Sequence, residues 1–118
     1  MGHPLVEIER INCSDGTTEY RDSHTGELHR LDGPARIRTD GAKEWYRRNK
    51  LHREDGPAIE RPNGAQMWYQ NGLLHRLDGP AIEWSESDHE FWIEGRFYNC
   101  TTIQNALSLW TIRQVLEV

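Results

Sequence analysis

Three histidine–arginine–aspartate sets are the residues of this chain best suited to chemistry. The string Leu-His-Arg-x-Asp-Gly-Pro-Ala occurs at 28–35, 51–58 and 74–81. A histidine can act as a general base oriented by a carboxylate, and both can ligate a metal. A catalytic constellation needs one asymmetric pocket, whereas these sets recur every 23 residues. We therefore predict structural corners, with ligand contact as the second interpretation and catalysis or metal binding last. The expected ion pairs are Arg30 with Asp32, Arg53 with Asp55, and Arg76 with Asp78.

The 23-residue period extends well beyond this string. Two aromatic columns keep the same register, the first being Trp45, Trp68 and Phe91 and the second Tyr46, Tyr69 and Trp92. Shorter echoes extend the repeat over residues 8–98. We therefore expect one domain spanning residues 1–118, most of it built from copies of one unit.

Turn residues divide each unit into short strands. Asn63-Gly64 and Asn71-Gly72 favour type I′ turns, which need positive φ at both central residues. Residues 65–70 between them are rich in strand-forming aromatic side chains. In Asp-Gly-Pro we expect the glycine to be left-handed, and proline disfavours helix at the residue before it. The sequence predicts a mainly β fold, an antiparallel meander of short repeated hairpins forming a single-layer sheet.

The C-terminal segment has a different pattern and predicts one α-helix over residues 101–117. Glycine and proline are absent after Thr101, and residues 101–104 fit a capping box. At about 100° per residue, one side carries Ile103, Ala106, Leu107 and Trp110, and the opposite side carries Leu109, Ile112 and Leu116. One side should cover the sheet, and the other should contact a second copy of the chain. The candidate oligomerisation residues are Leu109, Trp110, Ile112 and Leu116.

These motifs resemble a known kind of repeat. The 23-residue period, the aromatic pair, the Asn-Gly turn and the glycine-marked corner look like MORN-type β-hairpin repeats. The string Leu-His-Arg-x-Asp-Gly-Pro-Ala resembles a MORN-like variant found in uncharacterised proteins of phages and giant viruses. The corner departs from the better-known His-Gly-x-Gly pattern, so lipid-binding or scaffold roles are not carried over. The resemblance implies a single-layer hairpin sheet and a viral origin, and it implies no reaction.

Composition narrows the classes of protein that this chain can belong to. Hydrophobic residues make up 36% and charged residues 28%, which favours a thin fold over a thick core. A net charge of −5 argues against nucleic acid or anionic membranes as partners. No apolar stretch approaches the ~18 residues of a membrane span. Cys13 and Cys100 have no metal-ligand spacing and are expected to be reduced thiols of a cytoplasmic protein, the alternative being one bridge between them.

The aromatic columns supply the candidate binding residues. Neighbouring strand residues face opposite sides, so the columns should lie on opposite faces, of which one helix can cover only one. The uncovered column either packs across strands or forms an exposed binding strip. Arginine accounts for 12 of the 14 basic residues, and its planar group suits carboxylates, phosphates and aromatic rings. The candidates are Trp45, Tyr46, Arg47, Arg53, Trp68, Tyr69, Arg76 and Trp92.

These observations favour a binding protein over an enzyme. Phosphate-binding glycine loops and the GxSxG and HExxH motifs are absent from the sequence, and no cofactor is expected. We expect a non-enzymatic module that occludes a protein partner. The resemblance adds the expectation of a viral accessory protein that inhibits a host defence factor. The alternatives are sequestration of a small nucleotide or other phosphorylated ligand, and assembly of copies through the C-terminal helix.

Overall fold

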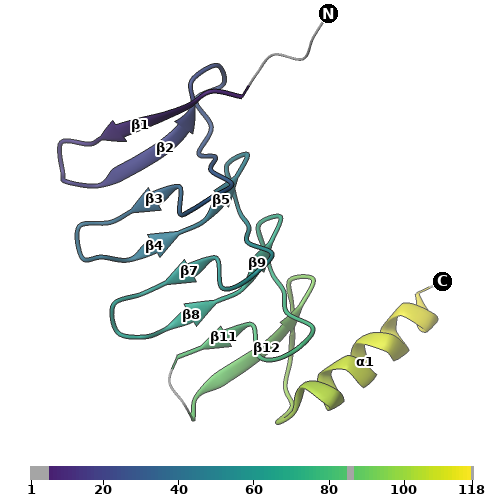
Figure 1. The fold of residues 1–118 in the computed structure, drawn as a ribbon. Helices are drawn as coiled ribbons and strands as arrows, with labels where there is room; N and C mark the ends of the chain where they lie inside the picture. Colours follow the sequence, from purple (N-terminus) through teal and green to yellow (C-terminus); the bar gives the residue numbers. More distant parts are fainter. Residues whose placement is uncertain (1–5, 85–86, 118) are drawn as a thin grey trace, which may run out of the picture.

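Short antiparallel strands, with a turn every few residues, build a flat plate with one helix at its end (Figure 1). The computed structural model describes residues 6–84 and 87–117. Within these residues there are 13 strands and one helix, and the principal extents are 43 × 42 × 18 Å. The structure confirms the predicted fold class, a mainly β antiparallel meander with a C-terminal helix.

The main sheet has nine strands, and each pairs antiparallel with its neighbours. In spatial order they are β1 (Ile8–Asn12), β2 (Thr18–Asp22), β3 (Arg36–Ile37), β4 (Lys43–Glu44), β7 (Ile59–Glu60), β8 (Gln66–Met67), β11 (Ile82–Glu83), β12 (His89–Ile93) and β13 (Arg96–Tyr98). The intervening strands form two small hairpins beside the sheet. These pair β5 (Tyr46–Arg47) with β6 (Lys50–Leu51), and β9 (Tyr69–Gln70) with β10 (Leu73–Leu74).

Two Asn-Gly turns were predicted, one between β9 and β10 (Asn71-Gly72) and one between β7 and β8 (Asn63-Gly64). At Asn71-Gly72 both residues have positive φ, 49° and 83°, which confirms the expected conformation. Asn63-Gly64 differs, because only Gly64 has positive φ. The Asn63 side chain there accepts a hydrogen bond from the backbone N–H of Ala65 at 3.0 Å. This side-chain turn suits a longer loop, so the type I′ prediction was wrong at this position.

The glycine of each Asp-Gly-Pro corner is required for space. Gly33, Gly56 and Gly79 do not have positive φ, so the prediction of a left-handed conformation was wrong. A Cβ on Gly56 would lie 3.0 Å from the Cζ of Arg53. The equivalent distances at Gly33 and Gly79 are both 2.9 Å. The guanidinium group occupies the volume that any other side chain would need.

The sheet has two apolar clusters, both towards its C-terminal half. Ile59, Met67 and Ile82 form one, and Tyr69 and Trp92 are among the residues packed against it. At positions equivalent to this cluster, the preceding unit has charged side chains. Glu44 is buried where a later unit has Met67, and Arg36 lies 3.4 Å from it and 3.1 Å from Glu19. The repeat therefore preserves the backbone while one face changes from ionic to apolar packing.

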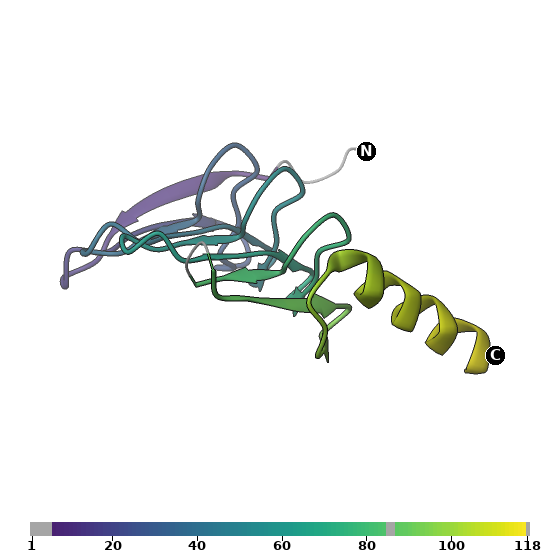
Figure 2. The same ribbon diagram turned by 90° about the horizontal axis from the view of Figure 1, so that it is seen from below.

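The helix α1 (Ile103–Leu116) begins beside the last hairpin and extends away from the end of the sheet (Figure 2). Its N-cap is Thr102, whose hydroxyl accepts from the backbone N–H of Asn105 at 3.2 Å. The predicted capping box of residues 101–104 was therefore wrong, because the helix begins at Ile103 and Asn105 takes the position expected for Gln104. The second apolar cluster consists of Phe91, Ile93, Tyr98 and Ala106. The helix side predicted to face the sheet packs there, namely Ile103, Ala106, Leu107 and Trp110. Asn99 stands 23 residues after Arg76, so α1 follows where another corner would form.

Replacing Gly56 with alanine should displace the Arg53 guanidinium and lower the free energy of unfolding by about 1 kcal/mol. Urea denaturation of Gly56→Ala, Arg53→Ala and the double variant measures this coupling. In the Arg53→Ala background the second change should be neutral or slightly stabilising, because alanine restricts the unfolded chain. Strictly additive effects would contradict this account of the corner.

Candidate functional site

Three corner loops rise on one side of the sheet, at residues 30–34, 53–57 and 76–80 (Figure 2). We call this side the corner-loop face. Each loop begins with an arginine whose guanidinium group covers an aromatic ring from an earlier part of the chain. The distances from Cζ to the ring centroid are 3.8 Å for Arg30 over Tyr20, 3.9 Å for Arg53 over Trp45 and 3.8 Å for Arg76 over Trp68. These contacts hold each corner against its strand.

The same arginines hold the corners together from within. The Nε of Arg53 donates to the Oδ1 of Asp55 at 3.0 Å, and its Nη1 donates to the carbonyl of Pro57 at 3.1 Å. Equivalent Nε bonds join Arg30 to Asp32 at 3.1 Å and Arg76 to Asp78 at 2.8 Å. The structure thus confirms the three predicted Arg–Asp pairs. The carboxylates themselves are largely exposed, and the bond from Arg76 lowers the pKa of Asp78.

The histidines connect each unit to the next one. Their Nδ1 atoms accept backbone N–H bonds from the following hairpin turn. The pairs are His29 with Arg48 at 3.0 Å, His52 with Asn71 at 2.9 Å and His75 with Glu94 at 2.9 Å. An acceptor at Nδ1 places the proton on Nε2, and burial lowers the pKa of His29 and His52. The Nδ1 atoms are thus acceptors here, whereas in a catalytic triad the histidine Nδ1–H donates to a carboxylate.

His52 has one further distinguishing feature. Its Nε2 is buried and has no hydrogen-bond partner among residues 6–84 and 87–117. A buried donor without an acceptor costs about 1–3 kcal/mol, so such a group is uncommon in a folded protein. His52 is also one of the residues that line a groove on the corner-loop face.

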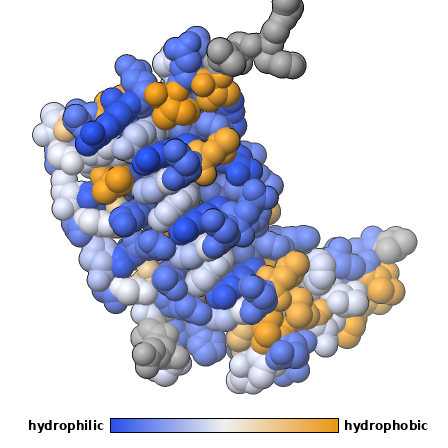
Figure 3. Space-filling view, in the orientation of Figure 1, coloured by the Kyte–Doolittle hydropathy of each residue, from blue (hydrophilic) through white to orange (hydrophobic). Residues whose placement is uncertain are grey.

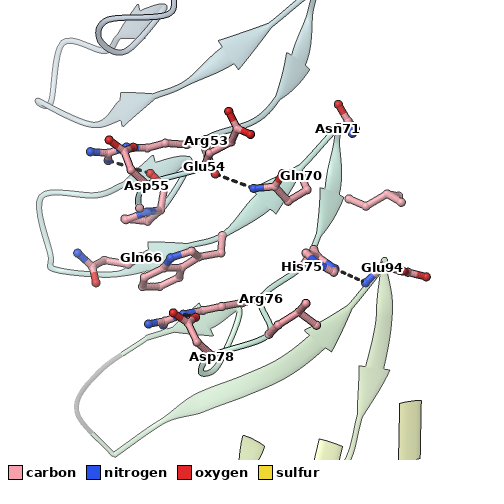
Figure 4. A pocket seen from close by; sticks show the side chains of 15 residues that line it. Arg53, Glu54, Asp55, Gln66, Gln70, Asn71, His75, Arg76, Asp78 and Glu94 are labelled. Carbon is pink, nitrogen blue, oxygen red and sulfur yellow. Dashed lines mark hydrogen bonds and ion pairs between the residues drawn. The ribbon is translucent and has the colours of Figure 1, made fainter. Parts of the chain in front are cut away.

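Grooves lie between the three ridges of the corner-loop face and beside the first one. The largest, about 870 Å³, lies between the 53–57 and 76–80 loops, with the Arg53–Asp55 and Arg76–Asp78 pairs on its two sides (Figure 4). The next, about 580 Å³, lies between the 30–34 and 53–57 loops and is lined by Trp45 and His52. The third, about 420 Å³, is lined by Tyr20, His29, Val6 and Ile8, among others.

The predicted binding residues are divided between the two faces. Trp45 and Trp68 line grooves of the corner-loop face, but Arg53 and Arg76 cover their rings. Arg47 makes an exposed ion pair of 3.3 Å with Glu54.

The second aromatic column is occupied by internal contacts. Tyr69 and Trp92 pack against the Ile59–Met67–Ile82 cluster, and the hydroxyl of Tyr46 donates to Glu44 at 3.3 Å. Burial raises the pKa of both Tyr46 and Tyr69. These side chains stabilise the sheet from within. Of the two outcomes expected for an uncovered column, this one packs across the strands and does not form an exposed binding strip.

The most exposed apolar side chains of the corner loops are not among the predicted binding residues. Position x of the repeated string is Leu31, Glu54 and Leu77, and all three are exposed. Leu31 is 69% and Leu77 is 43% exposed. The sequence did contain one indication of this exposed position: the residue at x differs between copies of the string, while its neighbours are the same in all three.

The candidate oligomerisation residues are also divided. Leu109, Ile112 and Leu116 are exposed on α1, whereas Trp110 packs against the Phe91 cluster. Figure 3 shows apolar surface over α1 and over β1–β2, with mainly hydrophilic surface between them.

Comparison with protein-family models, curated proteins and solved structures found no match to this chain. The resemblance to MORN-type repeats therefore rests on the sequence motifs alone. In the described part of the chain, no cluster of three or more His, Cys, Asp or Glu residues could hold a metal ion. The only described helix, α1, is too short to cross a membrane.

Stability should decrease when the buried histidines become protonated. Their folded-state pKa values lie below the unfolded value of about 6.5, so the unfolded chain binds more protons and the folded state loses stability as the pH falls. Urea denaturation between about pH 7.5 and pH 5 should show a decline of up to about 1.4 kcal/mol per pH unit for each histidine that stays neutral. A His52→Asn variant should show a shallower decline, and an unchanged slope would contradict the assignment.

Proposed function

We propose that this chain is a non-enzymatic binding module that occludes a protein partner with its corner-loop face. The observation that carries the proposal is the contrast within the repeated string. The histidine, arginine, aspartate, glycine and proline are used in internal contacts, and the alanine is fully buried at all three corners. The residue at x is exposed in every copy, and it forms an ion pair only in the middle copy, where Glu54 lies 3.3 Å from Arg47. At Leu31 and Leu77 it is an exposed leucine.

The shape and composition of this face support the same proposal. Exposed apolar side chains on ridges, rimmed by charge, are typical of interaction sites. The leucines stand beside the carboxylates of Asp32 and Asp78, and grooves run between the loops. A plate only 18 Å thick presents a broad surface for its size, which suits occlusion of a partner better than enclosure of a substrate.

The corner-loop face carries Trp45, Trp68, Arg53 and Arg76 of the predicted binding residues, but other side chains would contact the partner. Trp45, Trp68, Arg53 and Arg76 build the ridges, because their side chains are stacked on one another. The partner would instead meet the leucines and aspartates at the ridge tops. The sequence resemblance adds the proposal that the partner is a host defence factor inhibited by a viral accessory protein in the cytoplasm.

Assembly through α1 is the second candidate, supported by the exposed Leu109, Ile112, Val115 and Leu116 on the outer side of the helix. Nucleotide sequestration has less support. The Nε and Nη1 groups of Arg53, which would hold a phosphate, already bond to Asp55 and Pro57.

The test is capture of partners from a host lysate by the tagged protein, compared with the double variant Leu31→Asp, Leu77→Asp. Both leucines are exposed, so the melting temperature should change little while the captured partner is lost. The expected loss is at least tenfold, because charges are placed at two contact points. The matched control is Leu116→Asp, which charges a leucine that is 78% exposed on α1.

Each outcome separates the candidates. Loss of the partner with the corner-loop variant alone supports the proposal. If only Leu116→Asp abolishes capture, or changes the native mass of the purified protein, the assembly candidate replaces it. If both variants capture the partner as well as the parent does, the corner-loop face is not the interface.

A further inference from the structure

The grooves of the corner-loop face recur with a definite spacing. Each unit contributes two strands to the main sheet, such as β7 and β8. Neighbouring strands lie about 4.8 Å apart, so equivalent points on successive units lie roughly 10 Å apart. A ligand that contacts successive grooves in the same way must therefore repeat at roughly this distance.

A polyproline II helix has nearly this repeat. It has three residues per turn and rises about 3.1 Å per residue, so equivalent side chains lie about 9.3 Å apart. A β-strand places side chains on one face about 6.6 Å apart and would lose register after one groove.

The charge on the ridges indicates the kind of side chain that the ligand carries. Asp32, Asp55 and Asp78 stand at equivalent positions of the three corners and are largely exposed. In each pair the arginine Nε bonds to Oδ1, so the second carboxylate oxygen, Oδ2, is not used by that bond. The face thus presents carboxylate oxygens at one-unit spacing, which favours lysine or arginine in the ligand at every third residue.

The buried Nε2–H of His52 independently points to a ligand. His52 lines the groove between the first two corners, and its Nε2 has no acceptor within residues 6–84 and 87–117. The hydroxyl of Tyr98 and the Nε1 of Trp110 are also buried and unpaired in this part of the chain, but neither residue lines a corner-loop groove. A polyproline II segment has no internal hydrogen bonds, so its carbonyl groups are available as acceptors. The carbonyls of an α-helix are already bonded internally and would not supply one.

We propose that the corner-loop face binds a basic polyproline II segment of its partner, an inference that rests on the proposed function. The segment lies across the units and places every third residue at a groove. Asp32, Asp55 and Asp78 pair with the basic side chains, and the Nε2–H of His52 donates to a ligand carbonyl. This assigns a chemical class to the partner and a direction to its chain, perpendicular to the strands.

The test is fluorescence anisotropy with a labelled peptide, (Pro-Pro-Lys)₄. One control peptide, (Pro-Pro-Glu)₄, has the same backbone preference and the opposite charge. A second, Pro₄Lys₄Pro₄, has the same composition with its lysines adjacent. We expect (Pro-Pro-Lys)₄ to bind at least about tenfold more tightly than either control, because only it places a positive charge at each groove.

Protein variants then locate the site. The triple variant Asp32→Asn, Asp55→Asn, Asp78→Asn keeps each Oδ1 acceptor for arginine while removing three charges, and should weaken binding by about tenfold. The control Asp15→Asn, Asp40→Asn, Glu117→Gln removes three charges outside the corner loops and should leave binding within about twofold of the parent. His52→Asn keeps an acceptor near Nδ1 without Nε2–H, and should weaken binding while the protein remains folded by circular dichroism.

Three results would overturn the inference. These are absence of binding, equal affinity for (Pro-Pro-Lys)₄ and Pro₄Lys₄Pro₄, or equal weakening by both triple variants. If the leucine variants abolish partner capture while (Pro-Pro-Lys)₄ fails to bind, the class of ligand is wrong and the proposed function stands. If neither the peptide nor a partner depends on the corner loops, both are wrong.

Discussion

The stack of arginine on an aromatic ring is the interaction on which each corner of this structure depends. The guanidinium group of Arg53 lies between the ring of Trp45 and the Cα of Gly56. In that position its Nε reaches Asp55 and its Nη1 reaches the carbonyl of Pro57. The stack desolvates the planar group, which strengthens the hydrogen bonds made at its edge. The spacing of the repeated string follows from one side chain folding back over its own loop.

The two faces of the plate use this framework differently. On the face opposite the corners, buried Glu44 and its arginine partners in one unit give way to Met67 and Ile59 in the next. Such replacement is tolerated because neighbouring groups change together, and a buried carboxylate always has a cationic partner. The corner-loop face keeps its internal contacts and varies only at the exposed position. Variation is thus separated into packed positions on one face and an exposed position on the other.

The features predicted correctly from sequence were those governed by local chemistry. Turn residues marked the strands, the two-residue Arg–Asp spacing identified the ion pairs, and the apolar period of α1 identified Ile103 and Ala106 as its packed side. The features that were missed need groups brought together from different units. His52 receives its hydrogen bond from Asn71, and Arg53 covers Trp45, contacts that linear proximity does not reveal. The role of Gly56 depended on that stack, so it was assigned to backbone conformation instead.

The bond from each hairpin turn to the preceding histidine makes the architecture modular. Every unit contacts chiefly the unit before and the unit after, so cooperativity is transmitted between nearest neighbours, as in a one-dimensional array. Nothing in these contacts depends on the total number of units. Duplication of one 23-residue segment would reproduce every bond and lengthen the plate by roughly 10 Å. The length of the face can therefore change by whole units in evolution, each adding a groove in phase with the last.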